Sequence, residues 1–122
     1  MTTALVIEDN EDNRLVISLL LEDAGYQVRT ADDGESGYQT AVALQPDFIL
    51  LDIQLPDIDG TEVLRRLKKD SVTCGIPVIA VTSYAMSGDR ERLLAAGCNG
   101  YLEKPIDPEL IIAQIRKITG EG

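Results

Sequence analysis

One short run of apolar residues constrains this chain more than any other feature. Residues 48–51 are all apolar, and the run ends on Asp52 before a loop that contains Pro56 and Gly60. A short, fully apolar run bounded by turn residues predicts a strand buried on both faces, as in a parallel sheet. Asp52 would then lie at the carboxyl end of a central strand, where open α/β sheets bind ligands. Capping the following turn is the ordinary structural role for an Asp at this place.

Strand-like and helix-like segments alternate along the rest of the chain. Further strands are predicted at residues 4–7, 27–31, 77–82 and 99–103. Helices are predicted at about residues 14–24, 34–44, 61–69, 89–96 and 108–118. This (βα)5 alternation predicts a doubly wound, five-stranded parallel sheet with helices on both faces. With 122 residues, we expect a single domain over residues 1–122.

Apolar side chains mark the face that the first and last helices turn to the sheet. In the first helix the predicted core-facing stripe is Leu15, Val16, Leu19 and Leu20. In the last helix it is Ile111, Ile115 and Ile118, with Pro108 in the first turn. Gly25 fits the left-handed position that closes the first helix.

Polar residues that suit phosphoryl chemistry stand where the strands end. They are Glu8, Asp9, Asp52, Thr82 and Lys104. Because the carboxyl ends of parallel strands meet at one edge, these side chains would converge on one crevice. The acids after the first strand also suit the positive end of a helix dipole, which accounts for part of the cluster.

The predicted cluster has too many carboxylates to remain ionised without a cation. Glu8, Asp9 and Asp52 would need raised pKa values or a bound metal ion, and Mg²⁺ prefers a few carboxylates plus water. A carboxylate beside Mg²⁺ can act as a nucleophile and form an aspartyl phosphate. Lys104 and the Thr82 hydroxyl would then bind the phosphoryl oxygens.

Composition excludes several other functions. The chain has no histidine, which rules out Ser-His and Cys-His nucleophiles, imidazole metal sites and a phosphohistidine carrier. A net charge of −10 repels nucleic acid and anionic lipid, so we expect no direct nucleic-acid or membrane partner. Cys74 and Cys98 have no metal-like spacing, and no leader or apolar span is visible, so we expect a cytoplasmic protein.

These motifs resemble the receiver domain of bacterial response regulators. The resemblance rests on Glu8-Asp9, residues 51–60, Val81-Thr82-Ser83 and residues 101–105. It implies the flavodoxin-like strand order 2-1-3-4-5, a role in a two-component system, and phosphorylation by a histidine kinase or phosphotransfer protein. It implies no enzymatic activity beyond self-phosphorylation and self-dephosphorylation.

The resemblance assigns the reacting group and its metal. Asp52 matches the phosphoacceptor. Glu8 and Asp9 match the acidic pair that holds Mg²⁺ together with Asp52, with Glu in place of the more usual first Asp. The backbone carbonyl of Gln54 matches the remaining protein ligand.

The resemblance also assigns the residues that sense the phosphate. Thr82 matches the hydroxyl that moves to the phosphate, Lys104 matches its lysine partner, and Tyr101 matches the aromatic that turns inward on activation. The bond between Lys104 and Pro105 matches a cis peptide.

The resemblance further identifies two positions that tune loss of the phosphate. They are Gln54 and Tyr84, which stand two residues beyond the acceptor and the threonine. Because a bulky Tyr84 can shield the acyl phosphate from water, we expect slow self-dephosphorylation.

Residues 84–91 and 104–107 resemble stand-alone cell-division-type regulators and receivers of hybrid kinases. The chain ends at Gly122, soon after the last helix, so we expect no output domain and signalling by protein binding. The expected surface is the fourth helix, fifth strand and fifth helix, whose thin apolar face at residues 89–96 suits an element that switches. We expect a monomer or a phosphorylation-dependent dimer.

Other functions fit the residues less well. A haloacid-dehalogenase-type phosphatase needs a second Asp where Gln54 stands, and it needs room for a cap domain. An EF-hand loop with Gly60 at its sixth position would begin on Leu55, which is no ligand. A phosphorelay shuttle, an excised receiver of a hybrid kinase and a degenerate receiver that only binds protein all remain open.

Overall fold

A five-stranded parallel sheet forms the centre of the structure, a computed structural model that describes residues 2–83 and 87–120. The strands are β1 (Thr3–Ile7), β2 (Gln27–Ala31), β3 (Phe48–Asp52), β4 (Val78–Thr82) and β5 (Gly100–Glu103). Their order is β2-β1-β3-β4-β5. The predicted doubly wound, flavodoxin-like (βα)5 fold with order 2-1-3-4-5 is therefore confirmed.

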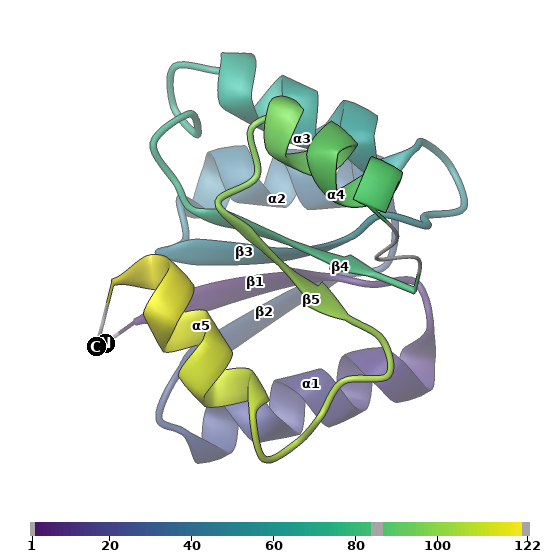
Figure 1. The fold of residues 1–122 in the computed structure, drawn as a ribbon. Helices are drawn as coiled ribbons and strands as arrows, with labels where there is room; N and C mark the ends of the chain where they lie inside the picture. The colour runs from purple at the N-terminus through teal and green to yellow at the C-terminus, as the bar shows by residue number, and fades with distance from the viewer. Residues whose placement is uncertain (1, 84–86, 121–122) are drawn as a thin grey trace.

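Helices cover both faces of the sheet. They are α1 (Glu11–Asp23), α2 (Gly34–Leu44), α3 (Gly60–Lys69), α4 (Ser87–Ala95) and α5 (Ile111–Thr119). Helices α1 and α5 lie on one face, and α2, α3 and α4 lie on the other (Figure 1). Within the described ranges, every helix is too short or too polar to cross a membrane.

The core lies in two layers, one on each side of the sheet. In β1, Leu5 and Ile7 pack toward α2, α3 and α4, whereas Ala4 and Val6 pack toward α1 and α5. All five residues of β3 are buried, as the apolar run predicted. Asp52 is therefore carried to the carboxyl end of a strand that has helices on both faces.

The predicted core-facing stripe of α1 is wrong for three of its four residues, and only Leu20 packs on the core. Leu15, Val16 and Leu19 are 58%, 48% and 57% exposed, and the buried side chains are Ile17 and Leu21. The apolar residues of α1 spread over more than half of its circumference, so apolar character alone does not identify the face that packs on the sheet. The spacing i, i+3, i+4 and i+7, here Ile17, Leu20, Leu21 and Ala24, identifies the face that packs on the sheet.

The last helix also begins later than predicted. Residues 108–110 form a turn, and α5 starts at Ile111, with Ile111 and Ile115 buried. Proline fits both places because its fixed φ suits a turn as well as a helix start. Gly25 has the expected left-handed conformation, with φ of 97°.

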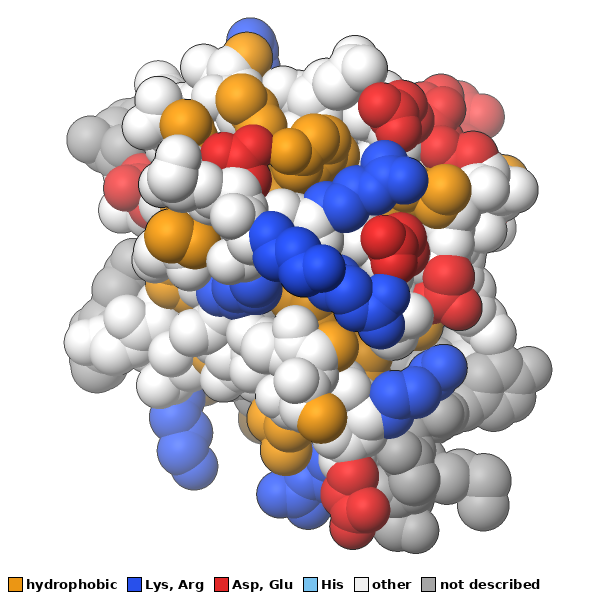
Figure 2. Space-filling model, turned by 90° about the horizontal axis from the view of Figure 1, so that it is seen from above, with side chains coloured by type: hydrophobic (Ala, Val, Ile, Leu, Met, Phe, Trp, Pro, Cys, Tyr) orange, Lys and Arg blue, Asp and Glu red, His pale blue; other side chains and the backbone are white. Residues whose placement is uncertain are grey.

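The face made by α2, α3 and α4 is unevenly charged (Figure 2). Helix α3 carries Arg65, Arg66, Lys68 and Lys69, although the whole chain has only 11 basic residues. Glu62 pairs with Arg65, and Glu35 pairs with Arg66. A strongly acidic protein thus has a mixed, partly basic surface over α3.

Candidate functional site

The sheet register brings the ends of four strands to one edge. Ile7 lies beside Leu51, Asp52 beside Val81, and Thr82 beside Glu103. Residues at or just after these positions therefore share that edge. The structure brings Glu8, Asp52, Thr82 and Lys104 to it, from β1, β3, β4 and β5 respectively.

An ammonium group joins two buried carboxylates at this edge. Lys104 Nζ lies 3.1 Å from Asp52 Oδ2 and 3.2 Å from Glu8 Oε2. Glu8 is 1% exposed and Asp52 is 2% exposed. One positive charge thus faces two buried negative charges, which leaves the pair incompletely neutralised.

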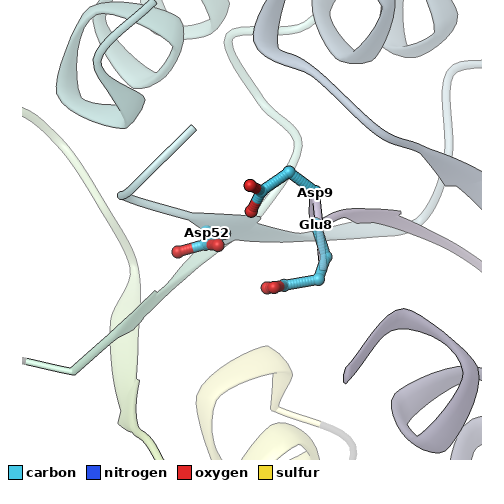
Figure 3. Close-up of side chains that lie close together, drawn as sticks. All are labelled: Glu8, Asp9 and Asp52. Carbon is cyan, nitrogen blue, oxygen red and sulfur yellow. The ribbon is translucent and has the colours of Figure 1, made fainter. Parts of the chain in front are cut away.

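A third carboxylate faces the same space (Figure 3). One oxygen from each of Glu8, Asp9 and Asp52 lies within 4.8 Å of the others, and the side chain of Asp9 is exposed. Two buried carboxylates beside one solvent-exposed carboxylate match the oxygen donors and retained waters that Mg²⁺ prefers. The residues present therefore fit a magnesium ion.

The electrostatics of the site reflect this excess of negative charge. Burial raises the pKa of Glu8 above its ordinary value, and the neighbouring Asp52 carboxylate raises it further, while Lys104 opposes the rise. Burial alone would lower the pKa of Lys104, but Asp52 and Glu8 outweigh that effect and raise it. Lys104 is therefore held firmly in its charged form.

Backbone groups orient the central carboxylate. The Gln54 N–H donates to Asp52 Oδ1 at 3.0 Å, which fixes this oxygen while Lys104 holds the other. This bond also brings the Gln54 backbone, a predicted metal ligand, to the edge of the site. Thr82 is buried at the end of β4, and its carbonyl accepts the Lys104 N–H at 2.8 Å.

The predicted switch residues lie farther from the acids. Tyr101 is half-buried on β5 beside Ala80 and packs against the layer under α3 and α4. The Arg90 guanidinium on α4 lies 5.5 Å from the centre of the Tyr101 ring, a cation–π contact. The Lys104–Pro105 peptide bond is cis. Tyr84 lies outside the described residues.

Two residues that bond to the backbone near the site, Arg14 and Asp57, have no signal in the sequence. Arg14 Nη1 donates to the carbonyl of Glu8 at 3.0 Å and to that of Asp9 at 3.5 Å, which fixes the loop after β1. Asp57 accepts the backbone N–H groups of Gly34 and Glu35. Neither contact could be predicted from the sequence, because the backbone groups that Arg14 and Asp57 bind are brought to them only by folding.

Comparison with known proteins places these observations in a family. The family model for the response regulator receiver domain matches residues 4–116. Among curated relatives, the polar-differentiation response regulators DivK of Brucella anthropi and Brucella ovis are each 40% identical over 120 residues, covering 98% of both chains.

Solved structures agree with the family model. The chemotaxis protein CheY4 of Vibrio cholerae is 28% identical, with a TM-score of 0.92 over 97% of this chain and 98% of that one. The receiver domain of the sensor histidine kinase PA1611 from Pseudomonas aeruginosa, solved with magnesium in its active-site cleft, is 34% identical. Its TM-score is 0.89 over 98% of each chain. This chain belongs to the response regulator receiver domain family of two-component signalling.

Proposed function

We propose that this chain accepts a phosphoryl group on Asp52 from a histidine kinase or phosphotransfer protein and signals by altered protein binding. The observation that carries the proposal is the pair of buried carboxylates, Asp52 and Glu8, joined by Lys104 with Asp9 beside them. A merely structural acid would not need a second buried carboxylate and a solvent-facing third one.

Asp52 is the nucleophile of the proposed transfer. One of its carboxylate oxygens attacks phosphorus, an O–P bond forms, and the donor's P–N or P–O bond breaks. The leaving group keeps the electron pair of that bond and is protonated from solvent. The Gln54 N–H and Lys104 hold the carboxylate in place, which supplies the positioning on which phosphoryl transfer depends.

The neighbouring residues stabilise the charge that the transfer brings. Lys104 is positioned to exchange its contact with Asp52 for one with a phosphoryl oxygen, and the Thr82 hydroxyl is the second donor proposed for this role. Glu8, Asp9, Asp52 and the Gln54 carbonyl would hold Mg²⁺. When bound, Mg²⁺ would neutralise charge on the phosphoryl oxygens.

Output is proposed to pass through α4, β5 and α5. Thr82 ends β4, and Tyr101 lies on the neighbouring strand β5 beneath α4. A change at Thr82 and Tyr101 would thus reach this face, where a downstream protein binds. We propose no catalytic turnover beyond self-phosphorylation and self-dephosphorylation. The proposed oligomeric state is a monomer or a phosphorylation-dependent dimer.

A second candidate is a relay receiver that passes its phosphate onward. The 34% identity to the receiver of a sensor histidine kinase favours this candidate, whereas the 40% identity to DivK proteins favours a stand-alone regulator. The two differ in the lifetime of the phosphate and in the ability to transfer it back to a phosphotransfer protein.

The first test is phosphorylation by a small donor. Wild-type protein and Asp52→Asn are incubated with Mg²⁺ and acetyl phosphate, and the intact mass is followed with time. We expect an addition of ~80 Da, one phosphoryl group, on the wild type alone, with the acid-stable and base-labile decay of an acyl phosphate. Asp47→Asn, at the opposite end of β3, is the matched control and should be modified like the wild type.

The outcome separates the candidates. Slow decay supports a stand-alone switch, and rapid decay with transfer to a phosphotransfer protein supports a relay. An equal addition on Asp52→Asn would place the phosphate elsewhere and overturn the assignment. No addition on any variant, even with a cognate kinase, would indicate a degenerate receiver.

A further inference from the structure

The loop between β3 and α3 is held at both of its ends. It leaves Asp52 and returns so closely that a Cβ on Gly60 would lie 2.4 Å from Ile53 Cα. The Gly60 N–H donates to the Ile53 carbonyl at 2.9 Å. At the far end, Asp59 Oδ1 accepts the Thr61 N–H at 2.8 Å and so caps α3. These bonds fix the loop ends but not the middle of the loop.

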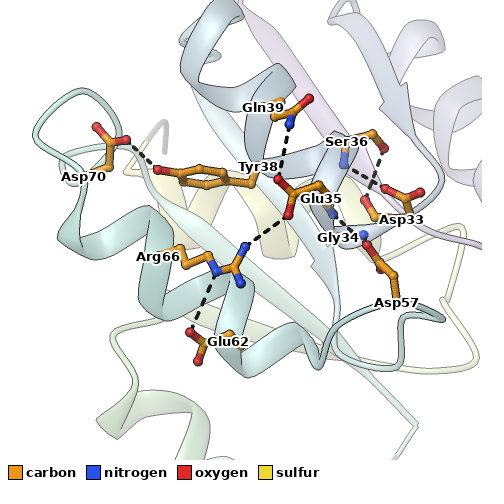
Figure 4. Close-up of polar contacts among 10 residues, drawn as sticks. All are labelled: Asp33, Gly34, Glu35, Ser36, Tyr38, Gln39, Asp57, Glu62, Arg66 and Asp70. Atoms are coloured by element: carbon orange, nitrogen blue, oxygen red, sulfur yellow. Dashed lines mark hydrogen bonds and ion pairs between the residues drawn. The ribbon is translucent and has the colours of Figure 1, made fainter.

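Asp57 fixes the middle of the loop by reaching a different helix (Figure 4). Its Oδ1 accepts the Gly34 N–H at 2.7 Å, and its Oδ2 accepts the Glu35 N–H at 2.9 Å. The partners lie 23 and 22 residues away in the chain. Both carboxylate oxygens are thus used on N–H groups of the first turn of α2, which have no partners within the helix.

The neighbouring residue makes the contact specific. Ile58 packs over Gly34 so closely that a Cβ on Gly34 would lie 2.4 Å from Ile58 Cγ1. Asp33 already caps α2 by accepting the Ser36 N–H at 2.7 Å. Because Asp33 already caps α2, the Asp57 carboxylate stabilises the position of the loop at least as much as it stabilises the helix.

Helix α2 is a rigid anchor for this contact. Gly37 lies against the side chain of Ile7 in β1. The Tyr38 hydroxyl donates to Asp70 Oδ2 at 2.7 Å, and Arg66 pairs with Glu35 at 3.1 Å (Figure 4). Helix α2 is thereby joined to β1, to the C-terminal half of α3 and to the α3 C-cap residue Asp70.

We propose that Asp57 is a positioning residue that holds the β3–α3 loop against α2 and so sets the geometry of the Mg²⁺ ligands. The inference rests on the proposed function, because the ligands concerned are Asp52 and the Gln54 carbonyl. Only two residues lie between Gln54 and Asp57, so a freed loop would shift this carbonyl. Mg²⁺ demands near-octahedral geometry, so a small displacement lowers its affinity.

The test is Mg²⁺ binding measured by titration calorimetry at neutral pH. We expect Asp57→Ala to weaken binding by about tenfold, as for other residues that support metal ligands. Asp57→Asn should weaken it less, because its single carbonyl oxygen can still accept one of the two N–H groups. Asp57→Asn also keeps the side-chain shape, so the test stands if Asp57→Ala folds poorly.

Asp47→Ala is the matched control. Asp47 Oδ2 also accepts a backbone N–H from a distant element, that of Thr3 at 2.7 Å, but it does so at the amino end of the sheet. It should lower the melting temperature while leaving Mg²⁺ affinity unchanged. If Asp57 contributed to stability alone, the Asp57 variants would likewise have a lower melting temperature and an unchanged Mg²⁺ affinity.

Linkage supplies a second readout. If the contact favours Mg²⁺ binding, Mg²⁺ must favour the contact to the same extent. We therefore expect Mg²⁺ to slow hydrogen exchange at the Gly34 and Glu35 amides of the wild type, and not at the Thr3 amide.

The outcomes distinguish the two proposals. Wild-type affinity in both Asp57 variants, with exchange at Gly34 and Glu35 unaffected by Mg²⁺, would overturn the role of Asp57 and leave the proposed function intact. A wild-type protein that fails to bind Mg²⁺ would overturn the proposed function and this inference together.

Discussion

At the scale of single residues, the buried carboxylates proposed to carry the chemistry also lower the stability of the metal-free protein. Asp52 and Glu8 are both buried, and Lys104 is their shared cation. Burial and Asp52 raise the pKa of Glu8, so the ionised Glu8 carboxylate is less favourable in the folded chain than in the unfolded one. A bound cation would relieve this repulsion.

Replacing Asp52 tests that balance. Asp52→Asn removes one of two buried like charges while Lys104 keeps Glu8 as a partner, so we expect metal-free stability to be unchanged or slightly higher. Melting curves in EDTA and in Mg²⁺ check this. Mg²⁺ should raise the melting temperature of the wild type more than that of the variant. A large loss of stability in EDTA would instead mark Asp52 as a structural residue.

Substitution of Tyr84 tests whether this side chain prolongs the lifetime of the phosphate. A large side chain beside an acyl phosphate would exclude attacking water, so Tyr84→Ala should shorten the phosphorylated lifetime. The measurement is decay of the phosphorylated mass after the donor is removed, with Tyr84→Phe as the control that keeps the ring. An unchanged decay rate in Tyr84→Ala would refute the shielding role.

At the scale of elements, a side-chain hydrogen bond joins α2 to the segment after α3. The Tyr38 hydroxyl donates to Asp70 Oδ2, and this bond, with one from the Val72 N–H, holds the pKa of Asp70 below its ordinary value. A carboxylate with a lowered folded pKa adds stability above its unfolded pKa of about 4. That stability is lost as the pH falls through the folded value.

The lowered pKa of Asp70 predicts how the stability lost in Tyr38→Phe depends on pH. We expect the variant to have a lower urea midpoint than the wild type at pH 7, and the difference to shrink as the pH falls below about 4. Asp70→Asn should show a similar loss at pH 7, and the double variant should lose less than the sum of the two. A difference that stays constant down to pH 2.5 would contradict a charge-dependent bond.

The elements also show how far the sequence is informative. Runs such as residues 48–51 specify strands because every position is buried, so composition alone suffices. In α1, apolar residues exceed what one face needs, and only packing against the sheet selects Ile17 and Leu21. The start of α5 was missed because Pro108 suits a turn and a helix equally.

The site was predictable where it depends on strand ends. Glu8, Asp52 and Lys104 follow buried strands, and parallel pairing brings such residues together. Arg14 and Asp57 bond to backbone groups, which have the same chemistry in every residue. Nothing in the sequence could therefore select Gly34 and Glu35 as the partners of Asp57.

At the scale of the whole molecule, the site must act on a distant face. The Arg90 guanidinium lies over the Tyr101 ring and so connects α4 to β5. If Tyr101 turns inward on phosphorylation, this contact is lost or weakened. A contact made in only one of two states stabilises that state, so Arg90 should favour the unphosphorylated arrangement.

Removing this contact should shift the balance between the two arrangements. A cation–π contact at an exposed site is worth about 0.5–1 kcal/mol, so Arg90→Ala should bind beryllofluoride, a phosphoryl mimic, about two- to fivefold more tightly. NMR titration in Mg²⁺ measures the affinity, and Lys117→Ala on α5 is the control with the same loss of charge. Equal affinity in Arg90→Ala and Lys117→Ala would mean that the contact is kept in both states. Weaker binding in Arg90→Ala would mean that Arg90 supports the phosphorylated arrangement instead.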